Sequence, residues 1–280
     1  MTHEWIDQPE GRLRVTKAGD HGSPVVLLSG AGMDNAHLSW ARLLPELARD
    51  HRVYALDWPK QGRSRPWRGI ADHPVMLRCV LAVLDHYDLA QADLVGMSQG
   101  GALALSTTIE SPERVRRLVA MAPGGIIAFP PVVHQLLWLT AKVPFLNSTM
   151  WTRLFRGRSA TAWFLRKFLF GGPVDDFDDV VDEVMAEIER SGGVTSSDWQ
   201  NTSIGFASMT VDLRPQLPTI SCPTLFIQGD KDVGIAPKYT RAAAAKVPGA
   251  RLEMIEGAGH WVQRQEPERV NELVRDFLAG

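Results

Sequence analysis

The pentapeptide Gly96-Met97-Ser98-Gln99-Gly100 has the residue types and spacing of a nucleophilic site. A short apolar run precedes it, and a segment rich in Ala and Leu follows it. A strand that turns directly into a helix holds its middle residue in a strained backbone conformation, so that this side chain projects outward. Glycines two positions away allow close approach where a Cβ would collide. The pattern therefore predicts that Ser98 is a nucleophile above a helix N-terminus, which favours negative charge.

A serine hydroxyl is a weak nucleophile and needs a neighbouring base to accept its proton. The chain has eight histidines, and His260 differs from the others in its surroundings. It lies at the end of a loop with two glycines, between an expected strand at 252–255 and the last expected helix. A lone histidine is more often structural than catalytic, but in combination with Ser98 we predict that His260 is the base.

The base in turn needs an acceptor that holds its tautomer and stabilises the imidazolium. Asp230 and Asp232 compete for this role in the loop that follows the expected strand at 224–228. Asp232 lies further into the loop and can reach toward the serine, whereas Asp230 suits the capping of a turn. We therefore predict that Asp232 holds His260.

Attack on a carbonyl group creates an oxyanion that preorganised N–H donors must stabilise. The backbone N–H of Gln99, next to the nucleophile, is the first predicted donor. The second is the N–H of Ala31, in the loop at 29–32 after the expected strand at 25–28. The alternative is that residues 29–32 form a glycine-rich turn with no catalytic role. This alternative is weaker, because the loop leaves its strand at the same sheet edge as Ser98.

The elements that must position these residues alternate along the chain. Short apolar runs bounded by Gly, Pro and Asp predict buried parallel strands at 25–28, 53–56, 93–97, 115–122, 224–227 and 252–255. Helical periodicity between them predicts helices at 38–48, 75–87, 100–110, 237–246 and 267–278. Residues 5–6 and 13–15 predict an antiparallel hairpin at the sheet edge. The fold class is therefore α/β, with a doubly wound, mostly parallel sheet of eight strands.

The alternation of strands and helices stops in the middle of the chain. Helical segments rich in Trp, Phe, Leu and Met are expected there at 132–142, 149–154, 160–170, 178–190 and 199–209. We predict a core of residues 1–124 and 218–280 and an inserted helical cap of residues 125–217. A cap above the site would shape an apolar pocket, and its predicted substrate-binding residues are Trp138, Trp163, Phe206 and, beside the base, Trp261. The alternative is that most of these side chains pack the cap's own small core.

Composition narrows the classes of partner. The net charge of -2 and the lack of a basic stripe predict no nucleic-acid partner. The two cysteines, Cys79 and Cys222, form no CxxC pair, so we expect reduced thiols. The predicted serine chemistry implies no metal and no cofactor. The first residues lack the features of a signal peptide, and the most apolar stretch, 129–146, is interrupted by polar residues and Pro144. We therefore expect a cytoplasmic protein without a membrane span, monomeric or homodimeric, that acts on a hydrophobic small molecule.

Five stretches in order resemble landmarks of the α/β-hydrolase superfamily. They are residues 25–40, 57–64, 96–101, 223–232 and 257–261. The chain order Ser98, Asp232, His260 is also the order of that superfamily. The resemblance implies a helical cap between the sixth and seventh strands. Two departures stand out, because many relatives have His-Gly where this chain has Ser29-Gly30, and Lys60 replaces a usual glycine. That histidine usually supports the oxyanion loop.

The resemblance also limits the chemistry. Epoxide hydrolases and haloalkane dehalogenases have a similar histidine loop, but their nucleophile is aspartate. The expected activity is that of a carboxylic ester hydrolase (EC 3.1.1), or a lactonase, working through an acyl-enzyme. Residues 259–263 are also similar to the C–C bond hydrolases that act on ring-cleavage products, and this is the alternative. A ligand receptor without turnover is a third hypothesis, against which the complete triad argues.

Overall fold

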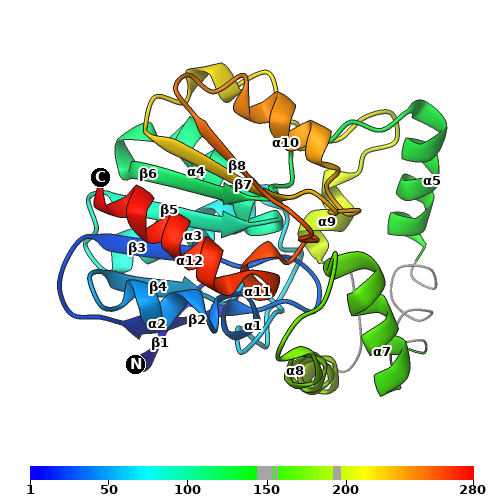
Figure 1. Ribbon diagram of the computed structural model, residues 1–280, viewed down its shortest axis with the longest axis horizontal. Coiled ribbons are helices and arrows are strands. Elements are labelled where there is room, and N and C mark those ends of the chain that lie inside the picture. The colour runs from blue at the N-terminus through cyan, green and yellow to red at the C-terminus, as the bar shows by residue number, and fades with distance from the viewer. Residues whose placement is uncertain (144–152, 154, 156, 192–196) are drawn as a thin grey trace.

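The computed structural model describes residues 1–143, 153, 155, 157–191 and 197–280. Its centre is an eight-stranded sheet in the order β1-β2-β4-β3-β5-β6-β7-β8. Figure 1 shows the strands side by side in this order. The strands are β1 Thr2–Gln8, β2 Gly11–Ala18, β3 Pro24–Leu28, β4 Arg52–Leu56, β5 Ala92–Met97, β6 Val115–Met121, β7 Thr224–Gly229 and β8 Arg251–Ile255. The β1–β2 and β2–β4 pairs are antiparallel, and the others are parallel. The predicted fold class is therefore confirmed.

The sheet is buried on both faces, which explains the continuous apolar runs of its strands. In β3, Val26 and Leu28 face one core cluster, whereas Val25 and Leu27 face the other. All four side chains have 0% exposure. Parallel strands covered on both faces need no polar alternation, so period-two patterning is absent from them.

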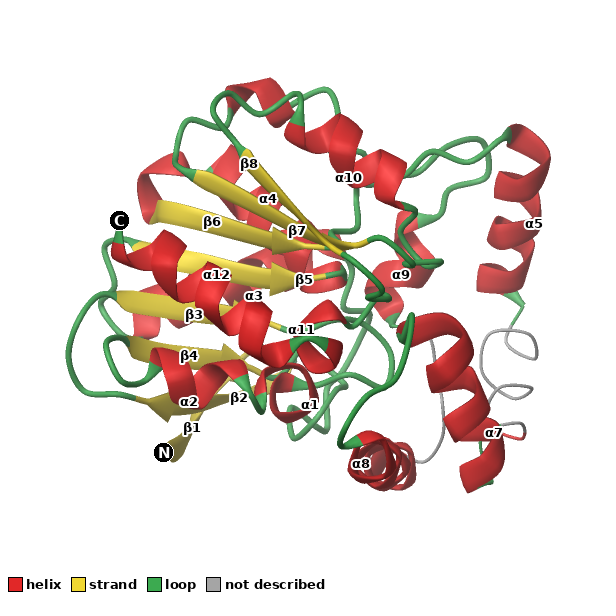
Figure 2. Ribbon diagram, in the orientation of Figure 1, coloured by secondary structure: helices red, strands yellow, loops and turns green. Residues whose placement is uncertain are grey.

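Helices cover the two faces of the sheet, as Figure 2 shows. One face packs against α3 His73–His86, α4 Gln99–Glu110 and α10 Pro237–Ala244. The other packs against α1 Ala36–Trp40, α2 Leu43–Leu47, α11 Val262–Gln265 and α12 Pro267–Ala279. The single helix expected at 38–48 is wrong, because two short helices lie there. Pro45 has no N–H to donate to the carbonyl of Ala41, so one continuous helix cannot form.

The helices between β6 and β7 lie beyond the carboxyl ends of the parallel strands (Figure 1). They are α5 Pro131–Lys142, α7 Arg158–Phe164, the π-helical turn Leu165–Leu169, α8 Phe177–Ser191 and α9 Asp198–Ser203. The helix expected at 199–209 ends early, since Ile204 and Met209 form a bridge that closes a turn. The helix expected at 149–154 falls almost wholly outside the described residues. No described helix is long and apolar enough to cross a membrane.

Candidate active site

Ser98 lies at the junction between β5 and α4, with φ 52° and ψ -114°. A positive φ is uncommon for a residue other than glycine and marks a strained turn. The glycines around it are sterically required. A Cβ on Gly96 would lie 2.3 Å from the Gly100 carbonyl oxygen, and a Cβ on Gly100 would lie 2.0 Å from the Leu28 carbonyl oxygen. The chain therefore turns around Ser98 in the conformation that the pentapeptide predicts.

Three side chains from separate loops form a continuous series of hydrogen bonds. His260 Nε2 lies 3.0 Å from Ser98 Oγ. His260 Nδ1 lies 2.8 Å from Asp232 Oδ2. These residues follow β8, β5 and β7, and the carboxyl ends of those parallel strands meet at one sheet edge. In this geometry the serine hydroxyl can pass its proton to an imidazole that a carboxylate holds in place.

Asp232 is 4% exposed and fully engaged. Its Oδ1 accepts the N–H groups of Gly234 at 2.7 Å and Ile235 at 2.9 Å, and Gln228 Nε2 donates to Oδ2 at 2.9 Å. Burial alone would raise the pKa of Asp232, but the charge and hydrogen bond of His260, together with the hydrogen bonds from Ile235 and Gln228, outweigh it and lower the pKa below its usual value. Asp232 is therefore an ionised acceptor near neutral pH.

Asp230 plays a different part in the same loop. Its Oδ1 accepts the N–H of Gly257 at 2.7 Å, so it ties the turn after β7 to the turn after β8. The two aspartates that compete on sequence grounds are thus separated by geometry, and only Asp232 contacts His260.

The two predicted oxyanion donors come from the ends of two neighbouring strands, β5 and β3. Gln99 is the first residue of α4, and Ala31 lies in the loop after β3, the strand that pairs with β5. Within the described residues, their backbone N–H groups have no hydrogen-bond acceptor. Free amides of this kind can stabilise a developing oxyanion.

The loop after β3 has supports that sequence reasoning misses. Gln61 Nε2 donates to the carbonyl oxygens of Gly30, Gly32 and Asp34, at 3.1, 3.3 and 2.8 Å. Trp58 Nε1 donates to the Ser29 carbonyl oxygen at 2.8 Å. Both side chains come from the loop at 57–64, which the sequence marks only as a family landmark. They hold the loop in a chain that lacks the usual histidine.

Asp34 is a further residue that sequence reasoning misses, and it is 1% exposed. Its carboxylate accepts the N–H of Gly30 at 2.7 Å, the N–H of Asn35 at 2.8 Å and the Ser39 hydroxyl at 2.5 Å. Burial raises the pKa of Asp34 to about 6, even though these hydrogen bonds lower it. No sequence signal separates Asp34 from an ordinary surface aspartate, because its burial depends on packing.

The predicted substrate-binding aromatic residues fall into two groups. Trp138 and Phe206 pack edge to face, with ring centroids 5.1 Å apart, and Phe206 is 59% exposed. Trp163 is 54% exposed. Trp261, in contrast, is 3% exposed and packs against Phe170, 6.0 Å between centroids. Their role in substrate binding stays a prediction.

Trp199 of α9 lies near the backbone of the nucleophile. A Cβ on Gly124 would lie 3.0 Å from the Trp199 ring and 3.5 Å from the Ser98 carbonyl oxygen. The Trp199 indole N–H donates to His73 Nδ1 at 2.9 Å, which fixes the ring. Among the described residues, no group of three or more His, Cys, Asp or Glu side chains could hold a metal ion.

Residues 23–267 match the model of the α/β hydrolase fold family. The chain belongs to this family. It is 29% identical over 272 residues to the 2-hydroxymuconate semialdehyde hydrolase of Pseudomonas sp. (strain CF600), covering 92% of this chain and 87% of that one. Its fold is similar to that of the enol-lactonase from Burkholderia xenovorans LB400, with a TM-score of 0.76, 21% identity and coverage of 99% and 100%. It is also similar to that of the carboxylesterase CesB from Bacillus subtilis, with a TM-score of 0.78, 21% identity and coverage of 99% and 91%. The protein is a hydrolase.

Proposed function

We propose that this hydrolase cleaves a carboxylic ester or lactone of a hydrophobic small molecule through an acyl-enzyme. The observation that carries the proposal is the series of hydrogen bonds from Ser98 through His260 to Asp232. Ser98 Oγ attacks the carbonyl carbon while His260 Nε2 takes its proton, and Asp232 stabilises the imidazolium. The N–H groups of Ala31 and Gln99 oppose the negative charge that forms on the carbonyl oxygen.

The rest of the cycle follows from the same groups. The tetrahedral intermediate collapses and breaks the C–O bond, and His260 donates its proton to the leaving alcohol oxygen. Water then attacks the acyl-enzyme while His260 removes one of its protons. The second tetrahedral intermediate releases the carboxylic acid and returns the proton to Ser98.

The test is Ser98→Ala on p-nitrophenyl esters of increasing acyl length. We expect kcat to fall by a factor of about 10⁶ if chemistry limits turnover. Ser106→Ala is a matched control in helix α4, which follows Ser98, since the buried Ser106 hydroxyl has no hydrogen-bond partner among the described residues. Activity of Ser98→Ala within tenfold of wild type would exclude Ser98 as the nucleophile.

A second candidate is hydrolysis of a C–C bond in a ring-cleavage product. The similarity to a 2-hydroxymuconate semialdehyde hydrolase favours it. Ser98 and His260 would serve the same attack, but the leaving group would be a carbon that must be protonated. A direct comparison of kcat/KM for 2-hydroxymuconate semialdehyde and for the ester panel decides between the two. A value for the semialdehyde at least a hundredfold above that for the best ester would replace the ester proposal.

A further inference from the structure

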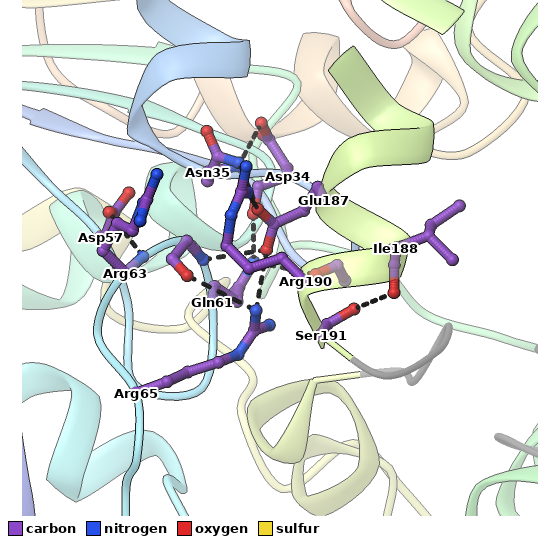
Figure 3. Close-up of polar contacts among 12 residues, drawn as sticks. Asp34, Asn35, Asp57, Gln61, Arg63, Arg65, Glu187, Ile188, Arg190 and Ser191 are labelled. Atoms are coloured by element: carbon purple, nitrogen blue, oxygen red, sulfur yellow. Dashed lines mark hydrogen bonds and ion pairs between the residues drawn. The ribbon is translucent and has the colours of Figure 1, made fainter. Parts of the chain in front are cut away.

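Glu187 is a charged side chain that is 1% exposed, on helix α8 between β6 and β7. Its carboxylate reaches the loops that follow β3 and β4, as Figure 3 shows. Its Oε1 accepts the Gly62 N–H and an Arg65 guanidinium N–H, each at 3.1 Å. Its Oε2 accepts the Asn35 side-chain amide at 3.0 Å and also pairs with Arg190. A buried carboxylate with this many donors is held in one position.

The first connection from Glu187 to the oxyanion loop runs through Asn35. Asn35 caps helix α1 by accepting the Leu38 N–H at 2.9 Å, so its amide is fixed between α1 and Glu187. Its own N–H donates to Asp34 Oδ1 at 2.8 Å. Asp34 Oδ2 in turn accepts the Gly30 N–H, one residue before Ala31. Each step is a buried hydrogen bond.

The second connection runs through the loop after β4. Glu187 binds the N–H of Gly62, which follows Gln61 directly in the chain. Gln61 holds the carbonyl oxygens of Gly30 and Asp34, on either side of Ala31. Both connections therefore end on the backbone that carries the proposed oxyanion donor, and Figure 3 shows Asp34, Asn35 and Gln61 gathered around Glu187.

We propose that Glu187 is a positioning residue that couples helix α8 to the oxyanion loop and keeps the Ala31 N–H aimed at the reacting carbonyl. This inference rests on the proposed function, since it concerns the donor that Ser98 chemistry uses. An oxyanion hole works only if its donors are fixed before charge develops. Because Gly30 and Gly32 restrict the loop's backbone little by themselves, its position depends on these hydrogen bonds, and Glu187 holds them from outside the loop.

Glu187→Gln keeps the size of the side chain but exchanges one acceptor oxygen for an N–H donor. If the new NH2 group takes the place of Oε1, it faces the N–H donors of Gly62 and Arg65; in the place of Oε2, it faces those of Asn35 and Arg190. In either orientation donor meets donor, and those hydrogen bonds are lost. One of the two connections is then lost, while the helix itself is retained.

The experiment measures the rate constant for labelling of Ser98 by a fluorophosphonate, together with kcat and KM for a p-nitrophenyl ester. In labelling, Ser98 Oγ bonds to phosphorus, fluoride leaves, and the proton passes to His260. We expect Glu187→Gln to lower both the labelling rate constant and kcat by about 10- to 100-fold, less than the loss of one whole donor. KM should change by less than about threefold, because the interaction strengthens only in the transition state.

Glu183→Gln is the matched control. Glu183 lies one turn earlier on α8 and faces His37 and Arg264, so it also bridges α8 to the core. Among the described residues it makes no hydrogen bond or ion pair with the loop after β3. We expect its labelling rate constant and kcat to stay within threefold of wild type. Equal losses in both variants, or kcat of Glu187→Gln within threefold of wild type, would overturn the proposal.

Thermal unfolding of each variant separates positioning from stability. If the activity of Glu187→Gln recovers on cooling in proportion to the folded fraction, the loss came from unfolding. That result would also overturn the proposal. Failure of the proposed serine mechanism looks different, because wild-type Ser98 would then resist the fluorophosphonate from the start. Failure of the ester assignment alone would leave wild-type labelling intact and would show as a lack of p-nitrophenyl ester turnover in the wild type.

Discussion

Replacement of Asp34 by asparagine tests whether the buried carboxylate that holds the loop after β3 titrates as its surroundings require. Burial raises the pKa of Asp34 from 3.8 to about 6. In the unfolded chain the carboxyl returns to its ordinary value. Between these two pH values the native state binds more protons than the unfolded state, so the free energy of unfolding falls as pH rises. This contribution is fully present below about pH 4 and is lost once the pH passes about 6.

The magnitude follows from the size of the shift. A difference of about 2 pKa units corresponds to about 3 kcal/mol between fully protonated and fully ionised Asp34. Between pH 4.5 and 7 the linkage relation gives a loss of about 2 kcal/mol. An asparagine side chain at this position does not titrate. The difference in unfolding free energy between wild type and Asp34→Asn should therefore change by this amount, whatever the substitution costs in itself.

The assay is urea denaturation of both proteins at pH 4.5, 5.5, 6.25 and 7, under conditions where refolding is complete. Ser39→Ala adds a second test, because the Ser39 hydroxyl donates to Asp34 and lowers its pKa. Without that donor the pH-dependent loss should extend to higher pH. A wild-type minus Asp34→Asn difference that stays constant within about 0.5 kcal/mol over this range would refute a raised pKa at Asp34.

Two further predictions concern the packing of the core. Gly100→Ala would place a Cβ 2.0 Å from the Leu28 carbonyl oxygen, so we expect a loss of about 4 kcal/mol or more, or no soluble protein; a normal thermal midpoint would contradict the steric requirement at the Ser98 turn. Burial raises the pKa of the Cys79 thiol to about 12, so iodoacetamide at pH 8 should modify Cys79 only in denaturant; peptide mass mapping separates Cys79 from the less buried Cys222, and modification of Cys79 in the native protein at the rate of a free thiol would contradict its burial.

The parallel strands and the strand-to-helix turn at Ser98 could be predicted because local sequence determines them. Each strand is a short apolar run between residues that break structure. Burial on both faces leaves such a run without a diagnostic period, so its short length and the residues that flank it identify it as a strand. The turn around Ser98 needs glycine at 96 and 100 for steric reasons that act within a few residues. Such features need no knowledge of the rest of the molecule.

The supports of the proposed oxyanion loop could not be predicted, because long-range packing creates them. Glu187 lies 152 residues from Asn35 in the chain, and nothing in the pattern of α8 marks it as different from Glu183. A charged residue on a helix is usually solvated, and the acidic stretch around Glu187 has the composition of such a solvated face. Only the packing of α8 against two core loops makes Glu187 buried and bound.

The two departures from the family pattern, at Ser29 and Lys60, concern the loop after β3 and the segment that holds it. Lys60 occupies a position with φ 66°, which explains why glycine is usual there. The strained lysine reaches Asp198 at the start of α9, with Nζ 2.6 Å from Oδ2. The next residue, Gln61, makes the hydrogen bonds to the loop at 29–34, where the usual histidine is replaced by Ser29. The segment at 57–64 thus contacts both the oxyanion loop and the helices between β6 and β7. Support of the proposed oxyanion loop in this chain thus comes from that segment and, under our proposal, from Glu187, in place of the usual histidine.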